Sequence, residues 1–390
     1  MFRDLKVLEL ASVLAGPSVG QFFAELGAEV TKVENLKTGG DITRTWKTAG
    51  ENTDDRSAYF CSVNWGKKSL AVDLKTAEGK AVVQKLAAKS DIVIASYKPG
   101  DAQKLGVSYE QLTRLPDGQG TNNPVRMARP GGQQLIYGQI TGYGSDNERV
   151  GYDAVIQAES GFMELNGEKN GLPTKMPVAL VDVLAGHHLK EGLLIALLKR
   201  ERTGEGSFVE VSLIQTAISS LTNQATNWLV AGKLPSRQGS AHPNIAPYGE
   251  SFLTKDGKRI LLAVGSDRQF FDLLHVLNID PITFEQKFST NHRRVENREE
   301  LGRVLAEQII HLNAAELLLK IHEFKIPAGI IQNVKEVFEM KEAKGLLIKS
   351  DGITGVRNFV ARVTGNQLPV TGLLPPPHFG EHTRQILENL

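Results

Sequence analysis

Short apolar runs of strand length alternate with amphipathic helical segments through the first third of the chain. The strand-like runs occupy residues 5–12, 29–34, 68–74, 91–97 and 133–144, and a helical pattern at 76–90 begins with Thr76 as its N-cap. Parallel strands require crossover connections, so this alternation predicts a parallel sheet covered by helices. We therefore predict an α/β fold with a large Rossmann-like domain, whose ligands bind beyond the carboxyl ends of the strands.

The first strand–helix turn lacks the glycine pattern of a dinucleotide site. Its sequence AGPSVG contains no GxGxxG, and no P-loop motif occurs anywhere in the chain. The sequence thus predicts the architecture of a nucleotide-binding fold without predicting NAD or ATP as the ligand.

The sequence pattern changes near Leu221. Beyond it, short strands joined by a KDG turn are mixed with helical stretches at 298–312 and 314–324. We expect a smaller α+β domain in this part of the chain. The predicted ranges are 1–220 for the first part of the large domain, 221–325 for the small domain and 326–390 for a C-terminal return to the large domain. The polar, Gly/Pro-rich stretch 115–134 is predicted to be an exposed loop.

The composition argues against several classes of protein. Lys and Arg total 45 against 44 Asp and Glu, so no net charge attracts nucleic acid or an anionic membrane. The single cysteine, Cys61, cannot form a disulfide within the chain and is expected to be a buried core residue. The start MFRDLKVLEL does not resemble a signal peptide, and no apolar run reaches the roughly 18 residues of a membrane span. We expect a cytoplasmic protein without nucleic-acid or membrane partners.

One carboxylate, Asp182, stands in the apolar stretch PVALVDVLAGHH before a long helical pattern. Asp is a favoured N-cap residue, worth about 1 kcal/mol, so helix capping is one interpretation. The other interpretation is a nucleophile, which the dipole and free N–H groups of a helix N-terminus would keep ionised. Gly186, one turn further on, would leave room for a close approach. This stretch alone leaves both interpretations open.

Several sequence blocks follow one another in order along almost the whole chain, from about Leu5 to Leu387. They include VLELASVLAGPSVGQFFAELGAEVTKVE, GGDITRTW, NWGKKSLAVDLKTAEG, SYKPGDAQKLGVSYEQL, GYDAVIQAESG, PVALVDVLAGHH and HPNIAPYGESF. Together they resemble the class III CoA-transferase family, which contains formyl-CoA transferase, carnitine CoA-transferase and the 2-methylacyl-CoA racemases. The resemblance implies an interlocked homodimer with a Rossmann-like large domain built from both chain ends.

Asp182 matches the catalytic aspartate of that family. The implied mechanism begins with its attack on an acyl-CoA thioester, which gives a mixed anhydride. The released CoA thiolate then forms an aspartyl–CoA thioester, and an incoming carboxylic acid takes over the CoA. The resemblance implies no metal and no cofactor other than coenzyme A, which acts as a substrate carrier. Succinyl-CoA or acetyl-CoA as donor, and a dicarboxylate or short organic acid as acceptor, are the hypotheses.

The racemase branch of the family is the first alternative. It carries a proton-shuttling His in a Gly-His-Asp motif, where this chain has Gly151, Tyr152 and Asp153. A tyrosine with a reference pKa of about 10 suits proton transfer poorly at neutral pH. His187 and His188 are predicted to be structural, because helical spacing turns them away from Asp182. A catalytically inactive CoA-binding protein is the second alternative.

The resemblance also implies contacts with coenzyme A and substrate. The candidate CoA-binding residues are Leu14, Ala15, Lys37, Val72, Asp73, Leu74, Lys75, Ser96, Tyr97, Lys98, Lys104, Thr141, Gly142, Tyr143 and Gly144. The candidate substrate residues are Tyr152, His242 and Tyr248.

Two of these positions depart from formyl-CoA transferase, which carries Gln at the position of Leu14 and Lys at that of Thr141. The loss of both polar groups argues against oxalate or formyl-CoA, and favours a larger or less polar acid.

Overall fold

The computed structural model describes residues 1–113, 134–280, 285–364 and 372–390. The loop predicted at 115–134 falls almost entirely outside this range. The described residues form two compact units. Unit 1 comprises Met1–Ser160, Met176–Leu221 and Lys344–Leu390, and unit 2 comprises Gly161–Lys175 and Thr222–Ala343.

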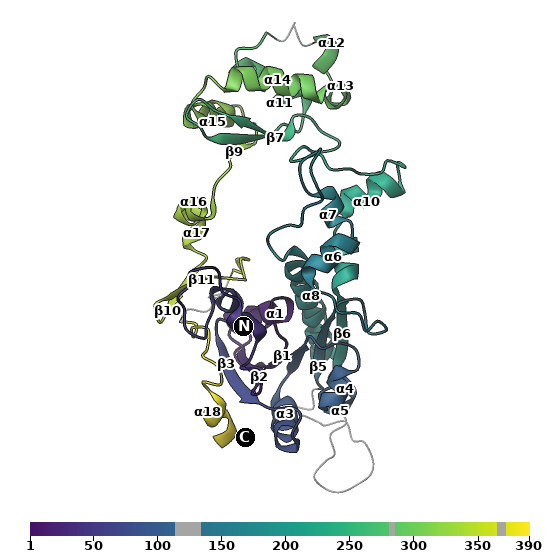
Figure 1. The fold of residues 1–390 in the computed structure, drawn as a ribbon, viewed down its shortest axis with the longest axis vertical. Coiled ribbons are helices and arrows are strands. Elements are labelled where there is room, and N and C mark those ends of the chain that lie inside the picture. Colours follow the sequence, from purple (N-terminus) through teal and green to yellow (C-terminus); the bar gives the residue numbers. More distant parts are fainter. Residues whose placement is uncertain (114–133, 281–284, 365–371) are drawn as a thin grey trace. The chain divides into compact units, whose positions relative to one another are not determined.

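Unit 1 is built on a six-stranded sheet in the order β3-β2-β1-β4-β5-β6 (Figure 1). Every neighbouring pair is parallel. This is the strand order of dinucleotide-binding folds, so the predicted parallel, Rossmann-like sheet is confirmed. The strands are β1 (Lys6–Leu10), β2 (Glu29–Asn35), β3 (Lys67–Val72), β4 (Ile92–Ala95), β5 (Ile136–Thr141) and β6 (Ser207–Ser212).

The sequence patterns predicted five of these strands and missed β6. In its sequence SFVEVS, exposed residues alternate with partly buried ones, which is typical of the edge strand that it is. The three long helices of unit 1 are α1 (Ala15–Glu25), α3 (Ala77–Lys89) and α8 (Leu180–Thr203). Thr76 caps α3 as predicted, since its hydroxyl accepts a hydrogen bond from the Gly79 amide at 3.0 Å.

Unit 1 also contains shorter elements. They are η1 (Ile42–Thr45), α2 (Ala58–Cys61), α4 (Asp101–Leu105), α5 (Tyr109–Thr113), α6 (Asp153–Glu159), α9 (Leu213–Ser219), β10 (Leu347–Ser350), β11 (Ile353–Val356) and α18 (Thr383–Glu388). Of these, β10 and β11 pair as a separate antiparallel sheet. Cys61 ends α2 and is buried, as expected. Burial raises its pKa to about 11, which makes it a poor nucleophile.

The core of unit 1 has an apolar part and a buried charged part. Leu8, Leu70, Val83 and Val93 belong to one apolar cluster that joins the sheet to α3. The strands β1, β2 and β3 also bury Glu9, Lys32 and Lys67. Glu9 pairs with Lys32 at 3.0 Å and with Lys67 at 2.7 Å, so these charges lie inside the protein as a connected network.

Unit 2 contains a three-stranded antiparallel sheet in the order β7-β8-β9 and several helices. Residues of this sheet and of α11, α14 and α15 form a single apolar core. The elements are α7 (Phe162–Leu165), α10 (Thr222–Leu229), β7 (Tyr248–Leu253), β8 (Arg259–Ala263), α11 (Asp267–Val276), α12 (Glu285–Phe288), α13 (Asn291–Glu296), α14 (Arg298–Ile309), α15 (Ala314–Glu323), β9 (Ala328–Ile330) and α16 (Val334–Glu339), and α17 (Lys341–Lys344) runs across the boundary to unit 1.

The two units differ from the predicted domain ranges at two places. Residues 161–175 belong to unit 2, and unit 1 resumes at Lys344 rather than at 326. The second difference has a direct cause, because β9 hydrogen-bonds to β8 and extends the sheet of unit 2. In the described ranges, no helix combines the length and the apolar character needed to cross a membrane.

Candidate active site

A pocket of about 200 Å³ opens beyond the carboxyl ends of β1, β4 and β5. The chain leaves β1 and β4 toward opposite sides of the sheet, and such switch points are where α/β folds bind ligands. The lining residues all belong to unit 1. They are Ser12, Val13, Leu14, Ala15, Gly16, Ser96, Tyr97, Lys98, Pro99, Ile140, Thr141, Gly142, Arg149, Val150, Gly151, Tyr152, Asp153, Asp182 and Leu213.

Asp182 enters this pocket from the first turn of α8. The helix begins at Leu180 with Ala179 as its N-cap, so Asp182 is an interior residue of the turn and the capping interpretation is wrong. The Asp182 residue is 8% exposed. Among the described residues, no hydrogen bond to its carboxylate is found, and this leaves the oxygens available for chemistry.

The electrostatics of Asp182 also differ from the expectation. Burial first, and then the negative charge of Asp153, raise the pKa of Asp182 to about 7. We expected the helix N-terminus to keep this group ionised, but removal from water outweighs that effect. A carboxyl with a pKa near neutrality is typical of a functional site.

Gly186 allows α1 and α8 to pack closely beside Asp182. A Cβ placed on Gly186 would lie 2.4 Å from Ser18 Oγ and 3.2 Å from the Ala15 carbonyl oxygen. The N-terminal turns of α1 and α8 therefore approach each other with almost no side chain between them.

The turn after β1 contains a strained residue. Val13 has a φ of 72°, a left-handed conformation that β-branched residues rarely adopt. Its amide donates to the two Asp41 carboxylate oxygens, at 3.2 and 3.3 Å. Lys32 pairs with the same carboxylate at 2.9 Å. This buried pair holds the turn whose next residues, Leu14 and Ala15, line the pocket.

A second pocket, of about 350 Å³, lies beside the first at the ends of β1, β2 and β3. It contains four of the candidate CoA contacts in one run, from Val72 to Lys75. Tyr97 lines both pockets, and burial raises its pKa to about 12. The structure therefore brings most of the candidate CoA contacts to two neighbouring pockets that share Ser12 and Tyr97.

Four candidate CoA contacts lie outside the linings of both pockets. Lys37 is exposed in the turn after β2. Lys104 pairs with Asp101 at 3.0 Å. The two others, Tyr143 and Gly144, follow β5 immediately, where the Gly144 amide donates to the Thr141 hydroxyl at 3.0 Å and the Tyr143 hydroxyl donates to Glu159 at 2.9 Å.

The remaining predicted residues divide between the two units. Tyr152 lines the pocket of Asp182 and is about half exposed. His187 and His188 are exposed on α8 and are absent from the lining of that pocket. His242 and Tyr248 belong to unit 2, where their rings contact each other at 5.2 Å.

The sequence patterns missed several polar residues of the site, among them Arg149, Asp153 and Tyr59. Arg149 and Asp153 line the pocket, and Tyr59 lies close enough to Asp182 for that charge to raise the Tyr59 pKa. The GYD motif could have drawn attention to Asp153, because it stands beside Tyr152. No sequence signal pointed to Tyr59, which reaches the site from α2.

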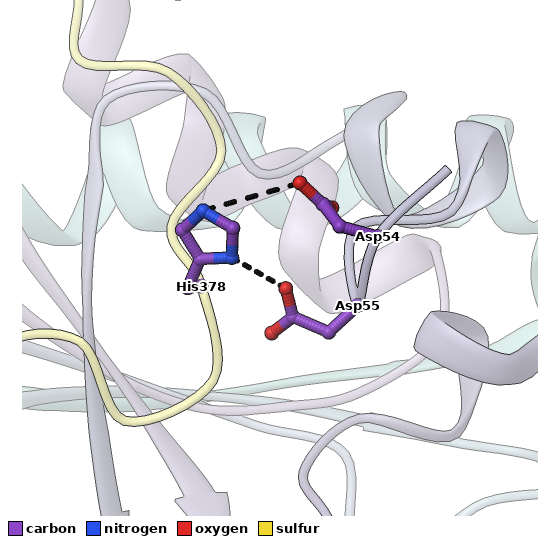
Figure 2. Close-up of side chains that lie close together, drawn as sticks. All are labelled: Asp54, Asp55 and His378. Carbon is purple, nitrogen blue, oxygen red and sulfur yellow. Dashed lines mark hydrogen bonds and ion pairs between the residues drawn. The ribbon is translucent and has the colours of Figure 1, made fainter. Parts of the chain in front are cut away.

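Asp54, Asp55 and His378 form a separate cluster in which both imidazole nitrogens face carboxylates (Figure 2). Nδ1 of His378 lies 2.5 Å from Asp55 Oδ1, and Nε2 lies 4.0 Å from Asp54 Oδ2. Within the described ranges this is the one group of His, Cys, Asp and Glu side chains spaced to hold a metal ion. Both carboxylates already pair with guanidinium groups, Asp54 with Arg56 at 2.7 Å and Asp55 with Arg44 at 3.3 Å. The adjacent guanidinium groups would repel a metal ion, which favours an ion-pair cluster over a metal site at this position.

Comparisons with known proteins agree on one family. The sequence model of the family described as CoA-transferase family III matches residues 2–383. The chain is 37% identical to succinate–glutarate CoA-transferase from Agrobacterium fabrum, over 99% of this chain and 94% of that protein. It is 34% identical to succinyl-CoA:glutarate CoA-transferase from Mus musculus, over 100% of this chain and 86% of that protein. A crystal structure of a CAIB/BAIF family protein from Brucella suis matches with a TM-score of 0.82 and 36% identity, over 99% of this chain and 98% of that one.

Proposed function

The chain belongs to CoA-transferase family III and is an enzyme of that family, and on this premise we propose that it transfers CoA between carboxylic acids through a covalent relay on Asp182. The observation that carries the proposal is the pocket itself. Two buried carboxylates, Asp153 and Asp182, line it at the switch point of the sheet, and the Asp182 carboxylate has no hydrogen-bond partner among the described residues.

The relay exchanges one thioester through four substitutions. The Asp182 carboxylate attacks the donor acyl carbonyl, which forms an anhydride and expels CoA thiolate. The thiolate attacks the aspartyl carbonyl, which forms an aspartyl–CoA thioester and releases the donor acid. The acceptor carboxylate attacks this thioester and expels the thiolate again. The thiolate then attacks the acceptor carbonyl, which releases the new acyl-CoA and regenerates Asp182.

We propose a short aliphatic dicarboxylate as the acceptor, with succinate and glutarate as the first compounds to test. Two cations, Lys98 and Arg149, line the pocket of Asp182. A guanidinium presents a fork of donors that suits a carboxylate. The names of both relatives contain two dicarboxylic acids. The apolar Leu14 and the neutral Thr141, each lining the same pocket, favour a longer acid than oxalate.

We propose that the pockets at the ends of β1–β5 bind coenzyme A as a substrate, with no further cofactor or metal in the reaction. Phosphates require cations, and Lys75 and Lys98 line the two pockets. Tyr97 offers an aromatic ring where the pockets meet.

An interlocked homodimer remains part of the proposal. One face of α8 exposes Leu194, Ile195 and Leu198, and a contiguous apolar patch of this kind is typical of an interface. Analytical ultracentrifugation tests the dimer, because a monomeric protein at micromolar concentration would contradict it.

The relay is tested with heavy-oxygen-labelled succinate and an acyl-CoA donor. One labelled oxygen is expected in the peptide that contains Asp182, because the acceptor's attacking oxygen stays with the aspartate. Quenching in hydroxylamine should also trap the thioester at this residue. The control is Asp182→Asn, which should take up no label and form no hydroxamate.

The outcomes separate the alternatives. Turnover without label in Asp182 would exclude the covalent relay. Binding of CoA without turnover on any donor would indicate an inactive CoA-binding protein. Exchange of the proton at the 2-position of a 2-methylacyl-CoA in heavy water, without CoA transfer, would indicate a racemase.

A further inference from the structure

The N-terminus of α8 is capped by a residue from another helix. The N-cap residue Ala179 has no side chain that can accept a hydrogen bond. Asp153, the first residue of α6, supplies the missing acceptor, because its Oδ1 accepts the Val181 amide at 2.8 Å. Val181 directly precedes Asp182. The backbone of the nucleophile is thus held by a carboxylate that also lines its pocket.

Asp153 is itself fixed by a neighbour one turn along α6. Its Oδ2 accepts a hydrogen bond from Gln157 Nε2 at 2.7 Å. The carbonyl oxygen of the same Gln157 side chain accepts the Met176 amide at 2.8 Å. Gln157 is 1% exposed, so its two hydrogen bonds are shielded from water. They hold the segment that leads into α8 in place.

We propose that Asp153 is a positioning residue for the nucleophile, which holds the first turn of α8 in place and sets a second negative charge beside the Asp182 carboxylate. This inference rests on the covalent role proposed for Asp182. A charge beside a nucleophilic carboxylate has a defined consequence. Acylation converts Asp182 from an anion to a neutral anhydride or thioester, which removes the repulsion from Asp153. The Asp153 charge therefore favours the acylated enzyme over the free carboxylate.

Other charged and titratable groups face Asp182 from separate elements. Tyr59 approaches from α2, and its pKa is raised to about 12 by burial and then by the charges of Asp182 and Asp153. Lys98 and Arg149 line the pocket from the chain after β4 and before α6. Burial first, and then Asp153, raise the pKa of Asp182, whereas Arg149 pairs with Glu159.

Asp153→Asn separates the two roles of this residue. The asparagine carbonyl can still accept the Val181 amide, but the charge is lost, and so is the acceptor for Gln157 Nε2. Gln157→Ala removes that second bond while Asp153 keeps its charge, and therefore serves as the control for its loss. The acid limb of the kcat–pH profile, measured with succinyl-CoA and glutarate, is expected to move down by about one pH unit. The level of hydroxylamine-trapped aspartyl–CoA thioester should fall. Asp146→Asn is the matched control, because it removes an exposed carboxylate from the loop before α6 and should leave both readouts unchanged.

The hydrogen-bonding role is tested by Asp153→Ala and Gln157→Ala. Asp153→Ala should lower kcat about tenfold or more while the KM for succinyl-CoA stays nearly constant, because small displacements of a reacting group are costly. Gln157→Ala should lower kcat without moving the acid limb, since the Asp153 charge remains. If Asp153→Asn fails to fold, as judged by thermal melting, Gln157→Ala decides the question, and an unchanged kcat would overturn the inference.

The same data distinguish failure of this inference from failure of the proposed function. Wild-type enzyme that turns over without a trapped adduct on Asp182 refutes the relay. Wild-type enzyme that forms the adduct, while Asp153→Asn keeps the wild-type acid limb and adduct level, leaves the relay intact and overturns the role of Asp153.

Discussion

Gly186 on α8 and Ser18 on α1 lie so close that a Cβ on the glycine would sit 2.4 Å from the serine hydroxyl oxygen. The Ser18 hydroxyl is not free to turn aside without loss, because it donates to the Ala15 carbonyl at 2.7 Å. Helix α8 carries Asp182, and the N-terminus of α1 lines the pocket. The lack of a side chain at Gly186 therefore allows these two helices to pack closely.

Gly186→Val is expected to destabilise the protein and to lower kcat. The added side chain must push α1 and α8 apart, and overpacking of this kind costs about 1–3 kcal/mol. Urea unfolding and steady-state kinetics measure the two effects. The control is Gly302→Ala in α14, where a new Cβ meets nothing within 4 Å. It should preserve kcat and stabilise by up to about 1 kcal/mol, through helix propensity. If Gly186→Val and Gly302→Ala changed stability and kcat equally, the close approach of α1 and α8 at Gly186 would be contradicted.

Asp182→Asn is expected to abolish transferase activity and to raise the stability of the fold above neutral pH. The folded-state pKa of Asp182 is raised from 3.8 to about 7, so the folded protein holds this proton more tightly than the unfolded chain. Between these two pH values the unfolded state ionises first, and stability falls as the pH rises. The full cost is present above about pH 7 and absent below about pH 4.

Thermal melting across this pH range measures the difference between wild type and Asp182→Asn. The gain in Tm from the substitution should grow from pH 4 to pH 7 and then level off. A constant difference at every pH would show that Asp182 ionises normally in the folded protein.

Lys67 and Lys68 are adjacent in β3, but their replacement by alanine should lower the free energy of unfolding by very different amounts. Lys67 is fully buried, where it forms an ion pair with Glu9 at 2.7 Å and donates a hydrogen bond to Asn64 Oδ1 at 2.8 Å. Burial lowers its pKa to about 8. Lys67→Ala leaves a buried carboxylate short of a partner and should cost about 3–5 kcal/mol. Lys68 pairs with Glu29 at 2.8 Å in a partly exposed position, so Lys68→Ala should cost less than about 1 kcal/mol.

Denaturant unfolding of these two variants supplies the test. If both variants lose a similar free energy of unfolding, the network of Glu9, Lys32 and Lys67 does not act as a buried unit. Because Lys32 of this network also pairs with Asp41, which holds the strained Val13 turn, we further expect Lys67→Ala to lower activity more than Lys68→Ala does.

His378→Ala is expected to loosen the C-terminal segment of unit 1. The imidazole pairs with Asp55, which also accepts the Phe379 amide at 2.6 Å. Burial alone would raise the pKa of Asp55, but the Phe379 amide and His378 outweigh it and lower that pKa. Hydrogen exchange at residues 378–381 should accelerate in His378→Ala. The control His292→Ala removes an exposed histidine of unit 2 and should leave this exchange unchanged.

Unchanged exchange in His378→Ala would show that other contacts hold the segment. Added Zn²⁺ or Mn²⁺ is expected to leave the wild-type Tm unchanged, because Arg44 and Arg56 already neutralise both carboxylates. A clear rise in Tm would instead identify a metal site.

Local sequence patterns predicted most of the strands of the six-stranded sheet. Strand-length apolar runs lie within or around β1 to β5, and Thr76 caps α3 as its position predicts. Strand β6 was missed because a half-buried edge strand carries a weak signal. The sequence also singled out Asp182, because an isolated carboxylate in an apolar stretch is conspicuous without any knowledge of its surroundings.

Only the tertiary structure decided what surrounds that carboxylate. Asp153 reaches the first turn of α8 across 28 residues of sequence, and Tyr59 comes from a different helix. The protonation of Asp182 depends on its removal from water and on the charges beside it. Both are properties of the assembled fold. A sequence records that an acid is present, but the charge that it carries follows from neighbours that folding brings together.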